Sequence, residues 1–298
     1  MRTIAISGAS GLVGTALSNL LVGQGVRVRP LVRPGKRADD GISWDPEGGH
    51  IDHAELEGLA ALVHLAGDGV ADGRWTAAKK ARIRDSRVRG TALLASALAK
   101  LSSPPRVWVS CSAVGYYGDR GADEIDESAP AGNDFLASVA QDWEAAADPA
   151  EVIGVRVVHP RLGIVLAPHG GALQKMLLPF RLGVGGKIGT GLQGMSWVSL
   201  DDTARAIVHM IEQEALSGPV NVTAPFPVTN AEFTRALGRA LHRPTMFGVP
   251  AQVARLAFGE LADGALLSGV RALPGKLLAS GFHFTHPELA PFLAASLA

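Results

Sequence analysis

Residues 4–21 combine an apolar run, three glycines spaced three apart and a second apolar run. The run before Gly8 is typical of a buried parallel strand, and Leu12–Leu21 is typical of a helix that begins where the glycines end. Because glycine has no Cβ, Gly8, Gly11 and Gly14 allow the first backbone N–H groups of a helix to approach a pyrophosphate. The stretch therefore predicts a dinucleotide site. A plain tight turn is the alternative, since the spacing differs from Gly-x-Gly-x-x-Gly.

The next strand is predicted at Val26–Val32, and Arg33 follows at its end. In a Rossmann unit this position faces the adenosine ribose, where an acid favours a free 2′-hydroxyl and an arginine accommodates a 2′-phosphate. Arg33, with Lys36 or Arg37, therefore favours NADP (NADPH) as the cofactor. A solvated basic loop is the alternative interpretation.

Strand and helix patterns continue to alternate along the first half of the chain. Strands are predicted at Ile42–Trp44, Ala61–Leu65 and Val107–Ser110, with one long helix at Lys79–Lys100. Such alternation is typical of βαβ units and a parallel sheet covered on both faces.

Small residues end the strand Ala61–Leu65. Ala66 and Gly67 leave room for a cofactor at the carboxyl end of a central strand, where open α/β sheets bind ligands. We expect Leu65, Ala66 and Gly67 to contact the cofactor. His64 within this strand is either a proton-transfer group or, as is commoner for a histidine in an apolar strand, a packed core residue.

Hydroxyl groups gather after the strand Val107–Ser110. Ser110 and Ser112 are followed by Tyr116 and Tyr117, the two tyrosines of the chain. Because active sites of this fold lie at the carboxyl ends of strands, we expect Ser110 to line the cofactor site. Ser112 would polarise a substrate oxygen, and Tyr116 or Tyr117 would donate a proton. A structural turn rich in serine and glycine is the alternative.

Composition excludes several other classes of protein. Basic and acidic residues number 28 each, so no global field favours nucleic acid or an anionic membrane. Six basic residues in the first half of the helix Lys79–Lys100 are interpreted as a solvated face. The single cysteine, Cys111, fits a reducing compartment, and no spacing resembles a metal site. Without a leader or an apolar run of spanning length, we expect a cytoplasmic protein with no membrane association.

The second half of the chain mixes short strands with helices. Val155–Val158 and Gly163–Leu166 are predicted to close the sheet, with Pro160 as a break between them. The glycine-rich stretch 183–194 around Lys187 either roofs a ligand pocket or forms turns. A helix is predicted at Asp201–Glu214, and Asn230 is expected to cap another that begins near Glu232. From about Phe247 the chain is predicted to be mostly helical.

Taken together, these motifs resemble the extended short-chain dehydrogenases/reductases, and more closely the atypical epimerase-family proteins with an uncharacterised small C-terminal domain. The resemblance covers essentially the whole chain. The segments that carry it are Ser7–Gly14, His64–Gly67, Ser86–Thr91, Ser110–Gly118, Asp142–Glu144, Met195–Val198 with Asp201–Asp202, and Asn221–Pro225.

The resemblance also exposes departures from the family's usual catalytic set. Ser112 matches the catalytic serine, but Phe135 and Val139 stand where the family has its Tyr-x-x-x-Lys pair, and Arg87 replaces an asparagine. Neither Phe nor Val can exchange a proton. Of the cations nearby, Arg87 is expected to assist a tyrosine and to lie at the cofactor.

Two further departures concern the substrate. Met195 replaces an arginine that holds the diphosphate of nucleotide sugars, and Ile164 replaces an asparagine that faces the substrate. A nucleotide-sugar substrate is therefore disfavoured, although Arg181 or Lys187 offers a substitute cation.

We therefore predict an α/β fold: a Rossmann-like doubly wound parallel sheet with a smaller, mostly helical C-terminal substrate domain. The nucleotide domain is expected at 1–166, completed by about 196–224, and the smaller domain at 167–195 and 225–298.

The expected function is that of an NADP-dependent oxidoreductase or epimerase-like enzyme acting on a small-molecule substrate. A non-catalytic NADP-binding or redox-sensing protein is the alternative, and the C-terminal helices form either substrate-domain walls or a homodimer contact. The residues expected to bind the cofactor are Gly8, Ser10, Gly11, Leu12, Val13, Gly14, Arg33, Leu65, Ala66, Gly67, Arg87 and Ser110.

Overall fold

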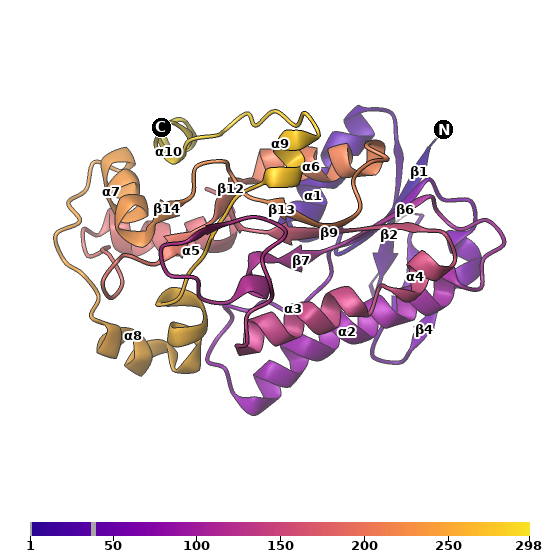
Figure 1. The fold of residues 1–298 in the computed structure, drawn as a ribbon, viewed down its shortest axis with the longest axis horizontal. Helices are drawn as coiled ribbons and strands as arrows, with labels where there is room; N and C mark the ends of the chain where they lie inside the picture. Colours follow the sequence, from indigo (N-terminus) through magenta and orange to yellow (C-terminus); the bar gives the residue numbers. More distant parts are fainter. Residues whose placement is uncertain (1, 37–39) are drawn as a thin grey trace.

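A computed structural model describes residues 2–36 and 40–298 of the chain. Its main sheet runs in the order β13-β9-β6-β5-β1-β2-β3-β4, and the short strand β7 also pairs with β9 (Figure 1). All neighbours in this sheet are parallel except β3 and β4. The strands are β1 Thr3–Ser7, β2 Arg27–Val32, β3 Ile42–Asp45, β4 His50–Ile51, β5 Ala61–His64, β6 Val107–Ser110, β7 Ser112–Ala113, β9 Arg156–Leu162 and β13 Gly218–Val222.

The strand order reverses between β1 and β5, because the chain first adds β2 and β3 on one side of β1 and then returns to add β5, β6 and β9 on the other. Ligands of open α/β sheets bind outside the carboxyl ends of the strands at such a reversal. The predicted doubly wound parallel sheet is confirmed, and its ligand crevice is expected beside Ser7 and His64.

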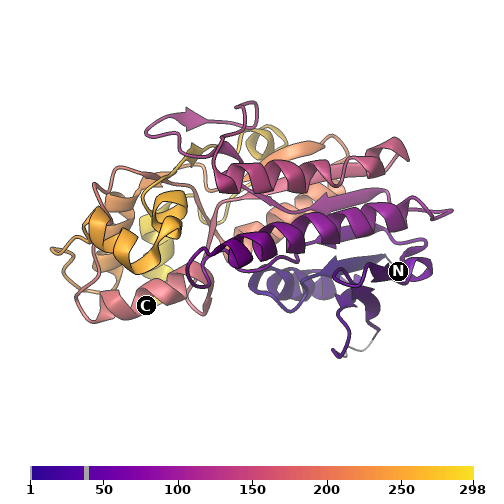
Figure 2. The same cartoon turned by 90° about the horizontal axis from the view of Figure 1, so that it is seen from below.

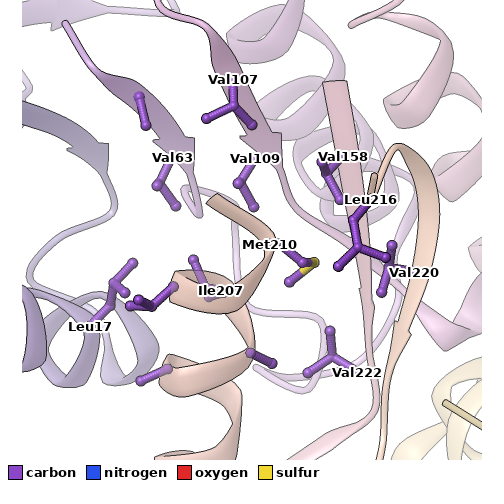
Figure 3. Packing of buried hydrophobic residues seen from close by; sticks show 14 of the residues in the cluster. Leu17, Val63, Val107, Val109, Val158, Ile207, Met210, Leu216, Val220 and Val222 are labelled. Carbon is purple, nitrogen blue, oxygen red and sulfur yellow. The ribbon is translucent and has the colours of Figure 1, made fainter. Parts of the chain in front are cut away.

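Helices cover both faces of the sheet (Figure 2). On one face, α1 (Leu12–Gly23) and α6 (Leu200–Glu212) bury Leu17 and Ile207 against Val63 and Val109 (Figure 3). On the other face, α2 (Ala77–Leu98) buries Leu94 and Leu98 against Leu62 and Trp108. The two helices α3 (Phe135–Ala145) and α4 (Pro149–Val152) lie beside α2 on this face. Both faces are therefore apolar, which explains the near-continuous hydrophobic strands.

The rest of the chain forms a second cluster of elements with its own core around Trp197, Phe233 and Phe292. Its helices are α5 Gly171–Arg181, α7 Asn230–Ala240, α8 Ala251–Phe258, α9 Gly275–Ala279 and α10 Leu289–Leu297, with a π-helical turn at Ala262–Leu266. Three two-stranded sheets pair β10 (Ile164–Ala167) with β12 (Trp197–Ser199), β11 (Gly194–Met195) with β14 (Val228–Thr229), and β15 (Arg271–Ala272) with β8 (Glu124–Ile125). Leu277 and Phe282 pack instead into the core of the main sheet. The exact domain boundaries stay a prediction.

Pro160 was expected to break the sheet, and this prediction is wrong. Strand β9 runs through it, pairing with β6 up to Val158 and with β7 from Arg161. The carbonyl of Pro160 faces Cys111, in the gap between β6 and β7. The absent N–H therefore falls where this edge of β9 has no strand partner, which is where a sheet tolerates proline.

Two other local predictions are also wrong. Residues 164–166 belong to β10, which pairs with β12 outside the main sheet, and β13 closes the sheet instead. Asn230 does not cap α7 but is its first residue. Thr229 is the cap, accepting from the Glu232 N–H while Glu232 accepts from the Thr229 N–H. The Thr-x-x-Glu spacing of this capping box was visible in the sequence.

Candidate functional site

The turn between β1 and α1 forms a cradle that only glycine permits. Gly8 has φ +70°, and a Cβ there would lie 3.0 Å from the backbone nitrogen of Ala66. A Cβ on Gly14 would lie 2.2 Å from the Gly8 carbonyl oxygen. Gly11 is the helix cap, and it has no side chain to accept from the N–H groups at the start of α1. The first N–H groups of the helix are thus left for an anion, so the residues present fit the diphosphate of a dinucleotide.

The side chains of this turn pack away from the cradle. Leu12 packs against the backbone of Gly170 and Gly171, and Val13 packs onto the core beneath the helix. Ser10 is exposed. The side chains of Leu12 and Val13 are therefore not available to a ligand. The groups that remain available in this turn are its backbone and the hydroxyl of Ser10.

A buried pair of side chains supports the opposite wall of the cradle. Ser7 Oγ accepts from the N–H groups of Leu65 and Ala66 at 3.2 and 3.3 Å, and lies 2.5 Å from Nδ1 of His64. Burial, aided by the charge of Arg87, lowers the pKa of His64 to about 3. His64 is neutral and fully buried, which favours the packed-core interpretation over proton transfer.

Arg87 lies behind Gly67 rather than beside the tyrosines. Its Nη1 donates to the carbonyls of Asp68 and Ile83, both at 3.0 Å, and its guanidinium lies 5.0 Å from the Trp143 ring centre. A Cβ on Gly67 would come within 3.1 Å of it, so Gly67 admits this close approach. The expectation that Arg87 would assist a tyrosine is therefore wrong. Its predicted place near the cofactor crevice remains compatible with this position.

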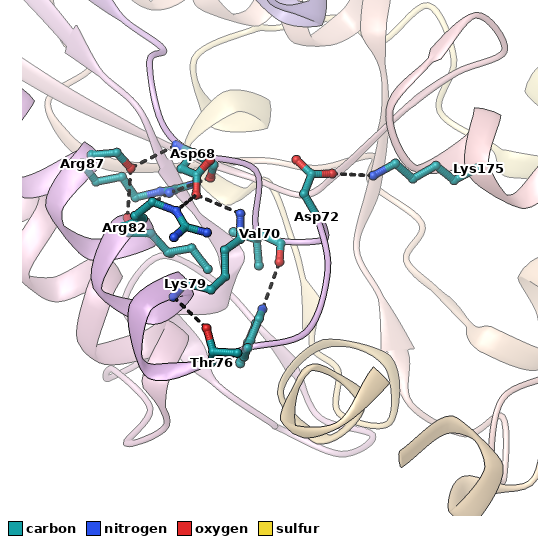
Figure 4. Close-up of polar contacts among 11 residues, drawn as sticks. Asp68, Val70, Asp72, Thr76, Lys79, Arg82, Arg87 and Lys175 are labelled. Atoms are coloured by element: carbon teal, nitrogen blue, oxygen red, sulfur yellow. Dashed lines mark hydrogen bonds and ion pairs between the residues drawn. The ribbon is translucent and has the colours of Figure 1, made fainter. Parts of the chain in front are cut away.

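The loop after β5 is held by ion pairs (Figure 4). The carboxylate of Asp68 accepts from Lys79 at 2.8 Å and lies 3.8 Å from Arg82. Asp72 pairs with Lys175 at 2.7 Å, which ties this loop to α5 of the smaller cluster. The loop that carries Gly67 is thus anchored to α2 by Asp68 and to α5 by Asp72.

Arg33 is exposed directly after β2. Two arginines of that strand are already engaged, Arg27 with Asp40 and Arg29 with Asp40 and Glu55. Within the described residues the Arg33 side chain makes no hydrogen bond or ion pair, so it is available to a phosphate. Lys36 is also exposed, whereas Arg37 lies outside the described residues.

A hydrogen-bonded chain begins at Ser112. Its hydroxyl donates to Glu144 Oε1 at 2.6 Å, and Arg161 binds both carboxylate oxygens of Glu144 at 2.9 and 2.8 Å. Burial opposes the charge of Arg161, but the bonds to Glu144 and Tyr117 outweigh it and raise the pKa of Arg161. Ser110, two residues before Ser112, is buried, and its hydroxyl has no partner within the described residues.

Arg161 also separates the roles of the two tyrosines. It donates to the Tyr117 hydroxyl at 3.0 Å, and that hydroxyl donates to Asn221 Oδ1 at 2.7 Å. Tyr117 is fully buried, and burial raises its pKa although Arg161 opposes the shift. Tyr116 is only half-buried, with the Arg161 guanidinium 3.4 Å from its ring centre. Tyr116 is thus the more accessible of the two predicted proton donors.

Sequence reasoning did not assign Glu144, Arg161 or Asn221 to the site. The available signal was the charge of Glu144 in a segment with apolar neighbours and that of Arg161 in a largely apolar strand, since a buried charge requires a partner. That signal does not say which charges meet.

The positions of the family's usual acid/base pair are apolar. Phe135 opens α3 with its ring centre 5.2 Å from that of Trp75, and Val139 is buried one turn later.

Met195 and Ile164 both pack with the core of the smaller cluster. The glycine-rich stretch 183–194 packs against residues 247–249, and Lys187 donates to the carbonyl of Thr190 in its own loop. This favours the turn interpretation of that stretch.

A cleft of about 550 Å³ opens beside Phe135. Three segments form it together with Trp75: the loop 117–120, residues 131–136 at the start of α3, and residues 260–268 around the π-helical turn.

Across residues 2–36 and 40–298, no group of three or more His, Cys, Asp or Glu side chains is placed to hold a metal ion. Over the same residues, no helix has the length and apolar character needed to span a bilayer.

Comparisons with known proteins agree with this arrangement. The sequence profile of the NAD dependent epimerase/dehydratase family matches residues 4–223, and that of a domain of unknown function, DUF1731, matches residues 249–296. The epimerase family protein Mb2239 of Mycobacterium bovis is 45% identical over 283 residues, which cover 95% of this chain and 93% of that protein.

Two solved structures are similar over nearly the whole chain. The human epimerase family protein SDR39U1 (isoform 2), crystallised with NADPH, has a TM-score of 0.89 and 35% identity, with 99% of both chains covered. A nucleoside-diphosphate sugar epimerase from Corynebacterium glutamicum has a TM-score of 0.82 and 34% identity, covering 99% of this chain and 58% of that one.

Proposed function

Because this chain belongs to the NAD dependent epimerase/dehydratase family, we propose that it is an NADP(H)-dependent oxidoreductase or epimerase-like enzyme acting on a small-molecule substrate without the family's tyrosine–lysine pair. The observation that carries this proposal is the buried chain Ser112–Glu144–Arg161–Tyr117 at the carboxyl ends of β7 and β9. Arg161 and Tyr117 are buried and the Glu144 side chain is 13% exposed; burying such ionisable groups is costly, and they concentrate at functional sites.

The cofactor site is supported by the cradle and by the free arginine. The backbone N–H groups after Gly8 would hold the diphosphate, and Arg33 would bind a 2′-phosphate. Leu65, Ala66, Gly67 and Ser110 would line the crevice beyond them. When bound, NADP(H) would supply or accept a hydride. The human relative that contains NADPH supports the same choice of cofactor.

The role of Ser112, which is itself buried, follows from its match to the family's serine, and the roles of the tyrosines follow from which of their hydroxyls a substrate can reach. Ser112 would turn its hydroxyl from Glu144 to a substrate oxygen, and the Glu144–Arg161 pair would hold the serine in place. Tyr116 would donate the proton, because it is half-buried and lies face-on to Arg161. Tyr117, which is buried and bonded at its hydroxyl, would position Arg161.

The alternative is a protein that binds NADP(H) and senses its redox state without turnover. The apolar surroundings of Phe135 and Val139 favour it, because no proton can be exchanged there. The same cofactor would be bound, so cofactor affinity cannot separate the two functions.

The test is NADPH oxidation with a panel of small aldehydes and ketones, measured for wild type, Ser112→Ala, Tyr116→Phe and Tyr117→Phe. Loss of a true acid/base group lowers turnover by roughly 10²–10⁴-fold while the NADPH dissociation constant stays nearly unchanged. We expect that pattern for Ser112→Ala and Tyr116→Phe. NADPH binding without turnover of any panel member would support the sensor, and full turnover in both variants would overturn the proposed site.

A further inference from the structure

The cleft beside Phe135 has an aromatic wall. Trp75 and Phe135 meet edge to face with ring centres 5.2 Å apart. Gly264 of the π-helical turn packs against the six-membered ring of the indole, since a Cβ there would come within 2.6 Å of it. The indole N–H is fixed by the carbonyl of Val70 at 2.9 Å. Trp75 is only 7% exposed and Phe135 is half-buried, so the parts of the two rings that line the cleft of about 550 Å³ form its apolar wall.

The charges that line the same cleft are mainly negative. Asp119, Asp134, Glu260 and Asp263 stand against a single lining cation, Arg120. Asp119 and Asp134 each accept hydrogen bonds from backbone N–H groups, and within the described residues neither has an ion-pair partner. Glu260 and Asp263 pair with Lys80 and Arg255, which lie outside the lining.

Arg120 is poorly placed to bind an anion. Its Nε donates to the carbonyl of Tyr117 at 2.9 Å and its Nη2 donates to that of Pro130 at 2.5 Å. Two of its donors are therefore taken by the loop that it braces. Met195 and Ile164 pack in another core. A second cation close to the cleft is Lys80, whose Nζ lies 4.9 Å from the Phe135 ring centre, but it is already paired with Glu260 at 2.6 Å.

We propose that this cleft is the substrate-binding pocket and that it selects small molecules with a flat apolar ring and a neutral or positively charged group, while disfavouring nucleoside diphosphates. The inference deepens the proposed function, on which it rests for the identification of a substrate. An aromatic wall attracts flat rings and cations, and the surrounding carboxylates favour a cation and repel an anion. The ring would lie on Trp75 and Phe135, at the start of α3 and close to the loop that carries the tyrosines.

Three indoles that share one ring and differ in charge test this proposal. Tryptamine is a cation at pH 7, tryptophol is neutral and indole-3-acetate is an anion. Their dissociation constants, with UDP-glucose as the nucleotide sugar, would be measured by calorimetry on the full chain saturated with NADPH. We expect tryptamine to bind about tenfold more tightly than indole-3-acetate, with tryptophol between them, and this ratio to shrink at high salt.

A pair of charge-removing variants ties the preference to the cleft. Glu260→Gln with Asp263→Asn, both at exposed positions, should reduce the tryptamine to indole-3-acetate ratio to about threefold or less. The matched control is Glu47→Gln with Asp52→Asn, two exposed acids near β4, at the far end of the molecule from α8 (Figure 1). The control should keep the wild-type ratio. Trp75→Leu should weaken tryptamine and tryptophol alike, by about three- to tenfold.

Tighter binding of indole-3-acetate or UDP-glucose than of tryptamine would overturn the inference. So would the absence of binding by every indole at millimolar concentration while NADPH binds, and the proposed function would survive that result. A chain that binds tryptamine with the expected charge preference but does not bind NADPH would contradict the proposed function instead.

Discussion

The Oγ of Ser112 lies 2.6 Å from Oε1 of Glu144, and the same carboxylate oxygen accepts a second hydrogen bond from Nε of Arg161 at 2.9 Å. Ser112 follows β6, Glu144 lies on α3 and Arg161 lies on β9. Three segments of the nucleotide-binding half therefore meet at one buried ion pair. The family resemblance predicts that the Ser112 hydroxyl contacts the substrate. In the structure this hydroxyl donates to Glu144, to which the resemblance gave no role.

Removing the acid from this pair should destabilise the fold. Glu144→Ala leaves Arg161 buried without its partner, at an expected cost of about 3–5 kcal/mol in the free energy of unfolding. Glu212→Ala breaks the exposed pair with Arg2 and should cost at most about 1 kcal/mol. Urea denaturation of both variants compares the two. Equal effects would mean that the Glu144 pair contributes no more than a surface contact.

The two tyrosines should respond differently to loss of the hydroxyl. Tyr117→Phe leaves buried Asn221 Oδ1 without its donor and should lower the free energy of unfolding by about 1–3 kcal/mol. Tyr116→Phe removes a half-buried hydroxyl and should leave stability nearly unchanged while lowering turnover. Thermal unfolding checks stability, and NADPH oxidation checks turnover. A stable Tyr117→Phe variant would argue against the buried hydrogen bond.

Two glycines of α1 provide a matched pair of substitutions to alanine. Gly14→Ala places a Cβ 2.2 Å from the Gly8 carbonyl, so the turn must shift, at a cost of about 1–3 kcal/mol and with weaker NADPH binding. Gly23→Ala, at the other end of α1, meets no atom within 4 Å and should be neutral or stabilising by up to about 1 kcal/mol. Fluorescence titration with NADPH and thermal unfolding measure both. Undiminished NADPH affinity in Gly14→Ala would place the cofactor elsewhere.

Arg33 should set the preference for NADPH over NADH. A charge-assisted hydrogen bond to a phosphate is worth roughly 1.5–3 kcal/mol, so Arg33→Ala should weaken NADPH about 10- to 100-fold. NADH lacks the 2′-phosphate, so its affinity should change little. Calorimetric titration with both cofactors decides this. Equal wild-type affinities for the two would remove Arg33 from the site.

His64 should make the protein less stable in mild acid. Its folded pKa of about 3 lies below the ordinary value of 6.5, so the unfolded chain takes up the proton first as the pH falls. The stability from neutral His64 is complete above about pH 6.5 and is lost progressively towards pH 3. Between pH 7.5 and pH 5 the expected loss is about 2 kcal/mol.

The measurement is urea denaturation of wild type and His64→Asn at the two pH values. The variant should be less stable at pH 7.5, because it loses the packing of the imidazole against Trp44, but its further loss at pH 5 should be smaller than that of wild type. An identical pH dependence in both chains would contradict the assignment. Other histidines, including buried His159, are present in both chains and cancel in the comparison.

Local sequence patterns were sufficient for the fold and for the glycine turn that we propose as the cofactor cradle. The glycines between β1 and α1, the alternation of apolar strands with helices, and Arg33 after β2 each depend on residues close together in the chain. Backbone geometry and side-chain periodicity act over such short distances, which is why these features could be read from the sequence. The capping box of Thr229 and Glu232 is equally local, because it depends on a Thr-x-x-Glu spacing.

Tertiary structure decided everything that depends on which distant segments meet. The sequence offered Arg87 as the cation near the tyrosines, but the fold directs Arg87 to Trp143 and brings Arg161 to Tyr116. Adjacent Tyr116 and Tyr117 differ in burial: Tyr117 packs with Val270 and Ala272, and its hydroxyl donates to Asn221, more than a hundred positions away. Pro160 is tolerated because β6 and β7 leave a gap beside β9. Burial and pairing of this kind are properties of the packed chain, since the free energy of a charge or hydroxyl is set by its neighbours in space and not in sequence.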